Sequence, residues 1–499
     1  MDYKDLAKNF AYYAYKHLGV DEMDMIYLEN LLLNKFNEDF PSTNEPPKKL
    51  IDSLEVPDYL INELYSLLGD RPDKERIATE IMGMITPSPS VVYKNFLSLR
   101  QNDDKKKALD YIYNLQIKNN YIQKTAIDKN IMWKYQMPDN FIEITINLSK
   151  PEKNNKDIAK ALLQSKSDIK YPKCLLCREN LGFKGTATHP ARQNIRIIPM
   201  KLNNEGFFMQ YSPYCYYDEH VIIINDEHTP MKISRETFKR HADFVDLIPE
   251  YFIGSNADLP IVGGSILSHE HYQGGIHLMP LMYSKDRFEI KTNNPNIKVS
   301  YLDWFNSCVC IKSHDKESII DAMDKLRIKW KDYDDIECDI LSHTNNTPHN
   351  TITPILRKVN DEYIAYAILR NNRCDEKYPD GIFHAHKEYH NIKKEGIGLI
   401  EAMGLFILPG RLQRQCKKME ELIVDDNYDL EKFYLENEDM RVHNDMILSL
   451  QKLHPANPKE EIKNYINHVC KNILENTAVF KNDSKGNEHA YRFLKSIEF

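Results

Sequence analysis

The chain has 499 residues, 42% of them hydrophobic and 28% charged, which is the composition of a globular protein with two or three domains. Its net charge of −8 and pI of about 6.2 argue against a general nucleic-acid binder, which needs a basic surface. The sequence lacks both a ~20-residue apolar run and a signal-peptide pattern, and its nine cysteines are an odd number, so we expect a cytoplasmic protein with reduced thiols and no membrane partner.

Residues 1–165 are predicted to be mainly helical. Apolar residues recur every three to four positions in Leu6–Leu18 and in Met23–Phe36, which is typical of amphipathic helices. Pro46-Pro47 and Pro87-Ser88-Pro89 predict loops between helices. Because this region shows no catalytic constellation, we expect a helical elaboration or an interface.

After about residue 165 the pattern changes to short β-rich runs separated by turns. The predicted strands are Ile195–Pro199, Gly206–Tyr211, His220–Asn225, Gly275–Met279, Tyr363–Arg370 and Gly381–His386. Helices are predicted at Glu317–Trp330 and in the tail at Glu460–Glu475. Strands beside helices predict an α+β fold, which we divide into a helical region, 1–165, and two β-rich halves, 166–290 and 291–499.

The segment from Ser268 to Gly275 is the first candidate for chemistry. If it is extended, His269, His271 and Gln273 lie on one face, because strand side chains alternate. That face would offer one imidazole for a metal, one for attack on phosphorus and an amide for a phosphate oxygen. The alternative is packing, since histidines are common in half-buried strands and short motifs match by chance.

A second candidate is Cys174-Leu175-Leu176-Cys177. Two thiolates at this spacing can bind one tetrahedral ion from a tight turn, although a redox pair and a chance pair of packed cysteines are alternatives. Two histidines would complete a zinc site, and His228 and His269 are plausible. Spacing alone does not favour His228 over His220 or His189.

Longer runs accompany these two motifs. They are Glu179–Gly182, His189–Pro199, Gln210–Tyr214, Tyr217–His220, Tyr251–Ser265, Gly381–His386, Lys393–Glu395, Gly398–Glu401 and Leu408–Arg411. With these runs the chain resembles the class II hexose-1-phosphate uridylyltransferases, the bacterial UDP-glucose:galactose-1-phosphate enzymes, over most of its length. The resemblance implies a histidine-triad-like fold of antiparallel sheets with flanking helices.

The resemblance also implies an activity in galactose metabolism. UMP would pass from UDP-glucose to galactose 1-phosphate through a uridylyl-histidine, giving UDP-galactose and glucose 1-phosphate. Class I relatives carry His-Pro-His-x-Gln where this chain has His269-Glu270-His271-Tyr272-Gln273. By that match His271 is the nucleophile and Gln273 contacts the transferred phosphoryl group. A neutral imidazole avoids bringing two anions together and divides the transfer into two displacements.

Ser265 lies near the phosphate-contacting serine of the relatives, and the chemistry of phosphate binding adds charged candidates, of which Lys394 and Arg411 are expected at the hexose-phosphate end. Those expected to bind substrate are Ser265, Arg192, Arg196, Asn194, Lys394 and Arg411, with ordinary surface pairing as the alternative for the arginines and a solvated face for a lysine. The expected zinc ligands are Cys174, Cys177, His228 and His269. Four protein ligands leave no open position, so this zinc would be structural.

Class I relatives carry a second metal site built partly on a Leu-His-Ala-His strand. His384 and His386 match that strand, and His349 is a third candidate ligand. Met282 stands where a glutamate is expected and Glu289 is distant, which argues against the second ion. Sugar or phosphate contact, or packing, is the alternative role for these histidines.

Two other function classes stay open at this level. One is a nucleotide hydrolase or dinucleoside polyphosphate phosphorylase on the same fold, which would prefer adenine nucleotides. The other is a zinc-stabilised binding module without catalysis, which the joint presence of His271 and Gln273 disfavours. The preferred hexose epimer and the oligomeric state, with a homodimer as one alternative, are not determined by the sequence.

Overall fold

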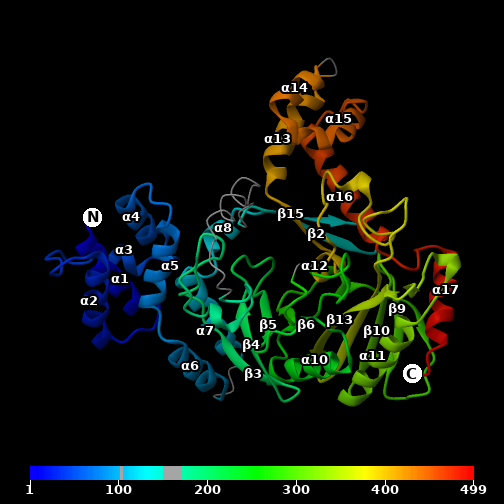
Figure 1. The fold of residues 1–499 in the computed structure, drawn as a ribbon, viewed down its shortest axis with the longest axis horizontal. Coiled ribbons are helices and arrows are strands. Elements are labelled where there is room, and N and C mark those ends of the chain that lie inside the picture. The colour runs from blue at the N-terminus through cyan, green and yellow to red at the C-terminus, as the bar shows by residue number, and fades with distance from the viewer. Residues whose placement is uncertain (102–104, 150–170, 265, 426–427) are drawn as a thin grey trace. The chain divides into compact units, whose positions relative to one another are not determined.

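The computed structural model describes residues 1–101, 105–149, 171–264, 266–425 and 428–499 (Figure 1). The chain divides into two compact units, Met1–Lys129 with Lys153–Thr229 and Asn130–Glu152 with Pro230–Phe499. This division differs from the three predicted segments, whose limits stay a prediction. Within the described ranges, no helix is both long and apolar enough to cross a membrane.

The first unit begins with helices, as predicted. They are α1 (Tyr3–His17), α2 (Met25–Phe36), α3 (Lys48–Asp52), α4 (Asp58–Leu68), α5 (Lys74–Ile85), α6 (Pro89–Gln101), α7 (Lys105–Lys118) and α8 (Lys124–Ile127). Helix α1 starts where the Asp2 side chain accepts a hydrogen bond from the backbone N–H of Asp5. It buries Leu6, Phe10 and Tyr13 completely, so its apolar stripe forms part of the helical core.

An antiparallel sheet completes the first unit. Its strands lie in the order β3 (Ile198–Leu202), β4 (Glu205–Tyr211) and β5 (Val221–Asn225), close to three of the predicted runs. Asn203 and Asn204, both with positive φ, connect β3 to β4. Two left-handed residues make the tight hairpin turn whose twist matches the flanking strands. The turn therefore fixes the register in which Leu202 pairs with Glu205.

The second unit contains a larger antiparallel sheet. The strand order is β7 (His271–Gly275), β6 (Phe252–Gly254), β13 (Asn350–Val359), β14 (Glu362–Asn371), β10 (Cys308–Ser313), β9 (Lys298–Leu302) and β8 (Asp286–Ile290). Helices α10 (Arg235–Leu247) and α11 (Lys316–Lys331) pack against it (Figure 1). Trp330 anchors α11, because its buried indole N–H donates to the carbonyls of Thr351 and Arg370 on the central strands.

Smaller elements surround this sheet in the second unit. Strands β1 (Ile131–Gln136) and β2 (Phe141–Asn147) pair antiparallel, and β15 (Leu405–Pro409) adds parallel to β2; β11 (His343–Thr344) and β12 (Thr347–Pro348) form a short ladder. The helices are α12 (Leu399–Ala402), α13 (Arg411–Ile423), α14 (Leu430–Glu436), α15 (Asn444–Gln451), α16 (Pro458–Asn476) and α17 (Ser484–Lys495). Helices α13, α15 and α16 contact one another and bury Met419, Ile447 and Ile466. The prediction of an α+β fold with antiparallel sheets is confirmed.

Two of the predicted strands are wrong. The strand near the histidine motif is His271–Gly275, earlier than the predicted Gly275–Met279, and residues 276–279 belong to no strand. Gly381–His386 is a turn and not a strand: Gly381 has a φ of 116° and Ile382 bonds across the loop to Arg373. Its residues from Gly381 to Ala385 are all buried, whereas a strand with one solvated face would alternate.

Candidate active site

Strand β7 presents the histidine motif on one of its two faces. The residues on the opposite face, Glu270 and Tyr272, are buried and meet Arg240 on α10. Arg240 donates to Glu270 at 2.7 Å and to the Tyr272 hydroxyl at 3.1 Å, and that hydroxyl donates to Glu270 at 3.1 Å. Such a buried, paired charge is costly to break, so this network ties β7 to α10 and fixes which residues face the other way.

His271 is the first residue of β7 and is almost fully buried, with 8% of its surface exposed. Its Nδ1 lies 2.8 Å from the carbonyl oxygen of His269. A carbonyl can only accept, so Nδ1 carries the proton and donates it, and Nε2 keeps a lone pair. Burial lowers the pKa of His271 below its ordinary value, which favours the neutral ring. The side chain is therefore held in the form that a nucleophile needs.

The residues around His271 are placed by glycine-rich backbone. Gln273 pairs with Gly254 across to β6, on the same strand and two residues from His271. A Cβ added at Gly263 would lie 2.5 Å from the Ala257 carbonyl oxygen, so this position admits no side chain. Ser265, the predicted phosphate contact, lies outside the described residues, and its role stays a prediction.

Three of the predicted zinc ligands come together in the first unit. The Sγ atoms of Cys174 and Cys177 are 3.5 Å apart, and Cys177 Sγ is 3.1 Å from His228 Nδ1. Ligand atoms around a tetrahedral zinc are separated by about 3.3–3.8 Å, and these two separations lie in that range or within about 0.2 Å of it, so the donor set suits the ion. With His269, a residue of the second unit, these three make up the set of four candidate zinc ligands.

Two histidines that the sequence could not distinguish from His228 have other roles. His189 Nε2 lies 2.6 Å from Asn180 Oδ1, and the Asn180 amide donates to the carbonyls of Cys174 and Cys177. His189 therefore supports the turn that carries the two thiols. His220 packs its ring against Tyr217 at 4.4 Å. An outer residue such as Asn180 has no spacing signal that would mark it in advance.

The redox alternative for the cysteine pair finds no support in its surroundings. Reactive thiols of redox pairs have a lowered pKa and sit at a helix N-terminus. Here burial raises the pKa of the Cys177 thiol to about 11, and only a three-residue 3-10 helix, Arg178–Asn180, follows it. These features are typical of a structural pair whose thiols lose their protons when they bind a metal.

Arg196 and Asn194 are occupied by contacts inside the first unit. The Arg196 guanidinium donates to five backbone carbonyls, those of Pro87, Gln193, Ile195, Gly83 and Thr86. Burial lowers its pKa to about 10, which still leaves it charged near neutral pH. Asn194 exchanges two hydrogen bonds with Asn119. These contacts favour structural roles for both residues, and substrate binding by either one stays a prediction.

Arg192 is more available than Arg196. It is half-buried, donates one hydrogen bond to the neighbouring Ala191 carbonyl at 3.1 Å and lies over the Tyr121 ring. A guanidinium held by a single backbone bond keeps donors for a ligand. Of the two predicted arginines, Arg192 is therefore the candidate for phosphate.

Lys394 and Arg411, predicted at the hexose-phosphate end, line one cavity of about 400 Å³ in the second unit. The other lining residues are His390, Asn391, Glu395, Gln415, Asp439 and Val442. Arg411 lies 3.8 Å from Glu395. Lys393, the neighbour of Lys394, is instead buried and pairs with Glu401 at 2.9 Å. The structure thus brings together two of the predicted cations and assigns Lys393 to an internal ion pair.

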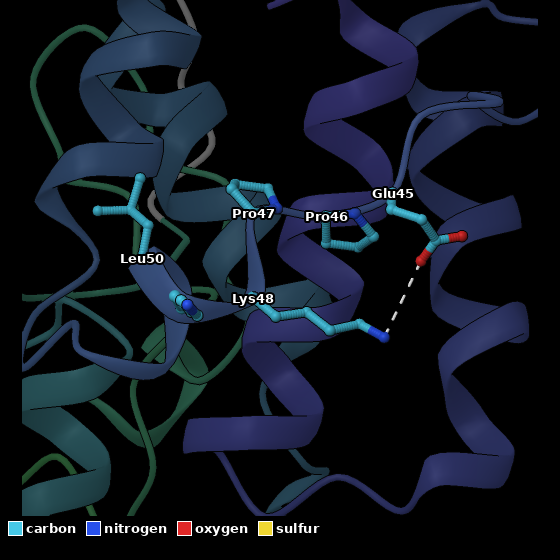
Figure 2. A pocket seen from close by; sticks show the side chains of 6 residues that line it. Glu45, Pro46, Pro47, Lys48 and Leu50 are labelled. Carbon is cyan, nitrogen blue, oxygen red and sulfur yellow. Dashed lines mark ion pairs between the residues drawn. The ribbon is translucent and has the colours of Figure 1, made fainter.

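Figure 2 shows a second hollow, of about 480 Å³, on the predicted Pro46-Pro47 loop of the first unit. Its other lining residues are Glu45, Lys48, Lys49 and Leu50, and Glu45 pairs with Lys48 at 3.9 Å. An ion pair this exposed contributes little. None of the predicted site residues lines this hollow.

The histidines proposed for a second metal are each engaged separately. His349 contacts Asn372 Oδ1 through Nδ1 and the Thr344 hydroxyl through Nε2, and His384 Nε2 accepts from the backbone N–H of Ile397. His386 Nε2 lies 3.0 Å from the carbonyl of Ile382. Among the described residues, these three do not gather into a group of metal ligands.

Comparisons with known proteins identify the family of the chain. Residues 23–230 match the family model "Galactose-1-phosphate uridyl transferase, N-terminal domain", and residues 244–436 match the model of the C-terminal domain. A galactose-1-phosphate uridylyltransferase of Fusobacterium nucleatum is 42% identical over 514 aligned positions, covering 100% of this chain and 99% of that protein. The chain belongs to the galactose-1-phosphate uridylyltransferase family.

Further relatives span the same length. The enzyme of the same name from Clostridium acetobutylicum is 42% identical over 489 positions, with 96% of each chain covered, and one from Streptococcus pneumoniae is 38% identical over 503 positions, with 99% of each covered. The prediction of a uridylyltransferase is thereby confirmed. Among solved structures, yeast Ap4A phosphorylase is 11% identical with a TM-score of 0.29, covering 60% of this chain and 89% of that chain.

A pair of arginine variants tests the structural role of Arg196. We expect Arg196→Met to lower the free energy of unfolding by about 3 kcal/mol, because five backbone carbonyls lose a charged donor. Arg192→Met, the matched control four residues earlier, should cost less than about 1 kcal/mol. Urea unfolding of both variants measures the difference, and equal small losses would contradict the structural role.

Proposed function

We propose that this chain transfers UMP from UDP-glucose to galactose 1-phosphate through a covalent uridylyl intermediate on His271. The observation that carries the proposal is the hydrogen bond between His271 Nδ1 and the His269 carbonyl, which leaves Nε2 as the nucleophilic atom. Membership of the uridylyltransferase family supplies the reaction class.

The transfer has two displacements. In the first, the Nε2 lone pair forms a bond to the α-phosphorus of UDP-glucose, and the bond to the bridging oxygen breaks to release glucose 1-phosphate. In the second, a phosphate oxygen of galactose 1-phosphate attacks the same phosphorus and the N–P bond breaks, giving UDP-galactose and the free imidazole. The ring is positively charged while uridylylated, and the Nδ1–H bond to the His269 carbonyl stabilises that charge.

Other residues of the chain would hold the anionic substrates. Gln273, on the same strand, would donate its amide to an oxygen of the transferred phosphoryl group. Lys394 and Arg411 would bind the phosphate of the hexose phosphate in the cavity that they line. Arg192 would contact the nucleotide phosphates, whereas the contacts of Arg196 and Asn194 give them a supporting role. Ser265 stays a predicted phosphate contact.

Cys174, Cys177, His228 and His269 would hold zinc, since two thiols and two imidazoles are its preferred tetrahedral set. When bound, the ion would supply a structural link with no open position for water or substrate. His269 is also the residue whose carbonyl holds Nδ1 of His271. Its imidazole would thus serve the metal while its backbone orients the nucleophile.

Steady-state kinetics test the proposed activity and its donor. With UDP-glucose varied at several fixed concentrations of galactose 1-phosphate, we expect parallel double-reciprocal lines, because one product leaves before the second substrate binds. ADP-glucose and diadenosine tetraphosphate serve as control donors. Turnover of the adenine nucleotides without a hexose 1-phosphate acceptor would instead identify a hydrolase or phosphorylase.

The zinc assignment is tested by Cys174→Ser. We expect this variant to lose bound zinc and to unfold at a lower temperature than the parent, because the ligand set and the turn are disrupted together. Cys374→Ser, which removes an exposed cysteine in the second unit, is the control and should change neither property. Metal analysis and a thermal melt give both readings, and an unchanged zinc content in Cys174→Ser would reject this ligand set.

A further inference from the structure

A second compact turn in the chain has the form of a metal knuckle. It lies in the second unit, where the 3-10 helix Ile336–Cys338 is closed by two backbone hydrogen bonds of 2.9 Å between Asp335 and Ile340. The backbone N–H of Cys338 also donates to the Asp335 carbonyl at 3.0 Å, and Asp339 takes a left-handed conformation to complete the turn. Asp335 and Cys338 are thus held at the same spacing as the two cysteines of the first knuckle.

Helix α17 brings an imidazole to this turn. His489 is buried, with 4% of its side chain exposed, and its Nδ1 lies 2.6 Å from Asp335 Oδ2. The Asp335 carboxylate, itself 9% exposed, also accepts a hydrogen bond from the Tyr333 hydroxyl at 2.9 Å. The contact holds a carboxylate and an imidazole side by side at this turn.

The turn and the helix together supply three different donor types. One ligand atom each from Asp335, Cys338 and His489 lies within 4.8 Å of those of the other two. A fourth donor is near, because Glu337 Oε2 is 3.5 Å from His489 Nε2 and its side chain is 69% exposed and able to move. A thiol, an imidazole and carboxylates form a mixed set that suits zinc better than the oxygen-seeking magnesium or calcium ions.

We propose that Asp335, Cys338 and His489 form a second divalent-cation site of zinc chemistry, distinct from the Cys174 group, with Glu337 or water as its fourth ligand. Tetrahedral zinc needs ligand atoms about 3.3–3.8 Å apart, so donors that all lie within 4.8 Å of one another reach this geometry by small side-chain movements. Binding releases the Cys338 thiol proton to solvent. The ion would join the C-terminal helix α17 to the turn. Its role is structural, because none of the predicted substrate-binding residues belongs to the site.

The competing account is that Asp335 and His489 form a hydrogen-bonded pair beside a packed cysteine, with no metal. Zinc stoichiometry of the full-length protein distinguishes the two. After chelation, reloading with a small excess of zinc chloride and removal of unbound ion, we expect about two zinc ions per chain. Saturation of the parent at a single ion that Cys338→Ser binds equally would overturn the proposal.

Variants locate the second ion. Cys338→Ser should retain about one zinc ion per chain, whereas the control Cys374→Ser, an exposed cysteine of the same unit, should retain about two. Two ions in Cys338→Ser would overturn the assignment. If the Cys174 group binds no zinc, the parent and Cys338→Ser each hold one ion fewer. The difference of one ion between them still reports the second site.

A protection experiment on the unmutated chain covers the case in which Cys338→Ser does not fold. The urea concentration is increased, but kept below the unfolding transition, until iodoacetamide labels Cys338 fully in the chelated protein. Mass spectrometry maps the labelled cysteines. Zinc should then slow labelling of Cys338 at least tenfold and leave that of Cys374 unchanged. Equal labelling of Cys338 with and without zinc would overturn the proposal.

Discussion

The hydrogen bond from His271 Nδ1 to the His269 carbonyl sets the protonation of the proposed nucleophile, and much of the surrounding structure serves to hold it. A neutral histidine exchanges its proton between two nitrogens, and only one tautomer leaves Nε2 free. Fixing that tautomer requires a rigid backbone from residue 269 to residue 271. The pairing of β7 with β6 fixes the strand from Gln273 to Gly275, and the buried Arg240–Glu270 pair holds the residue between the two histidines.

The alternation of side chains along this segment places the proposed reacting residues on one face and the residues that anchor the strand on the other. Glu270 and Tyr272 point to α10, where Arg240 donates hydrogen bonds to both. Strand alternation then directs His271 and Gln273 to the opposite face. Helix α10 is itself fixed at its start by a capping box between Ser234 and Thr237. A charge network on one face of the strand thus positions neutral donors and acceptors on the other.

The features that could be predicted from the sequence are those with a fixed local spacing. His269-x-His271-x-Gln273 and Cys174-x-x-Cys177 each indicate a candidate chemistry within a few residues. The alternation of apolar residues predicts the strands near Gly206 and His220. Lys394 and Arg411 were predicted at the hexose-phosphate end, and both line one cavity of the structure.

The features that could not be predicted depend on contacts far apart in the chain. Arg196 carries the same local signal as Arg192, and its burial comes from carbonyls more than 100 residues earlier. The partner of Glu270 is Arg240, 30 residues away on a helix. Gly381–His386 has strand-like residues but finds no neighbouring strand, since tertiary packing overrides local propensity.

The covalent intermediate is the central claim, and intact-protein mass spectrometry after mixing with UDP-glucose alone tests it most directly. The account predicts an increase equal to one uridylyl group on the parent, located on His271 by peptide mapping, and no increase for His271→Asn. An adduct on the variant, or none on the parent when UDP-glucose is shown to bind, would contradict the account.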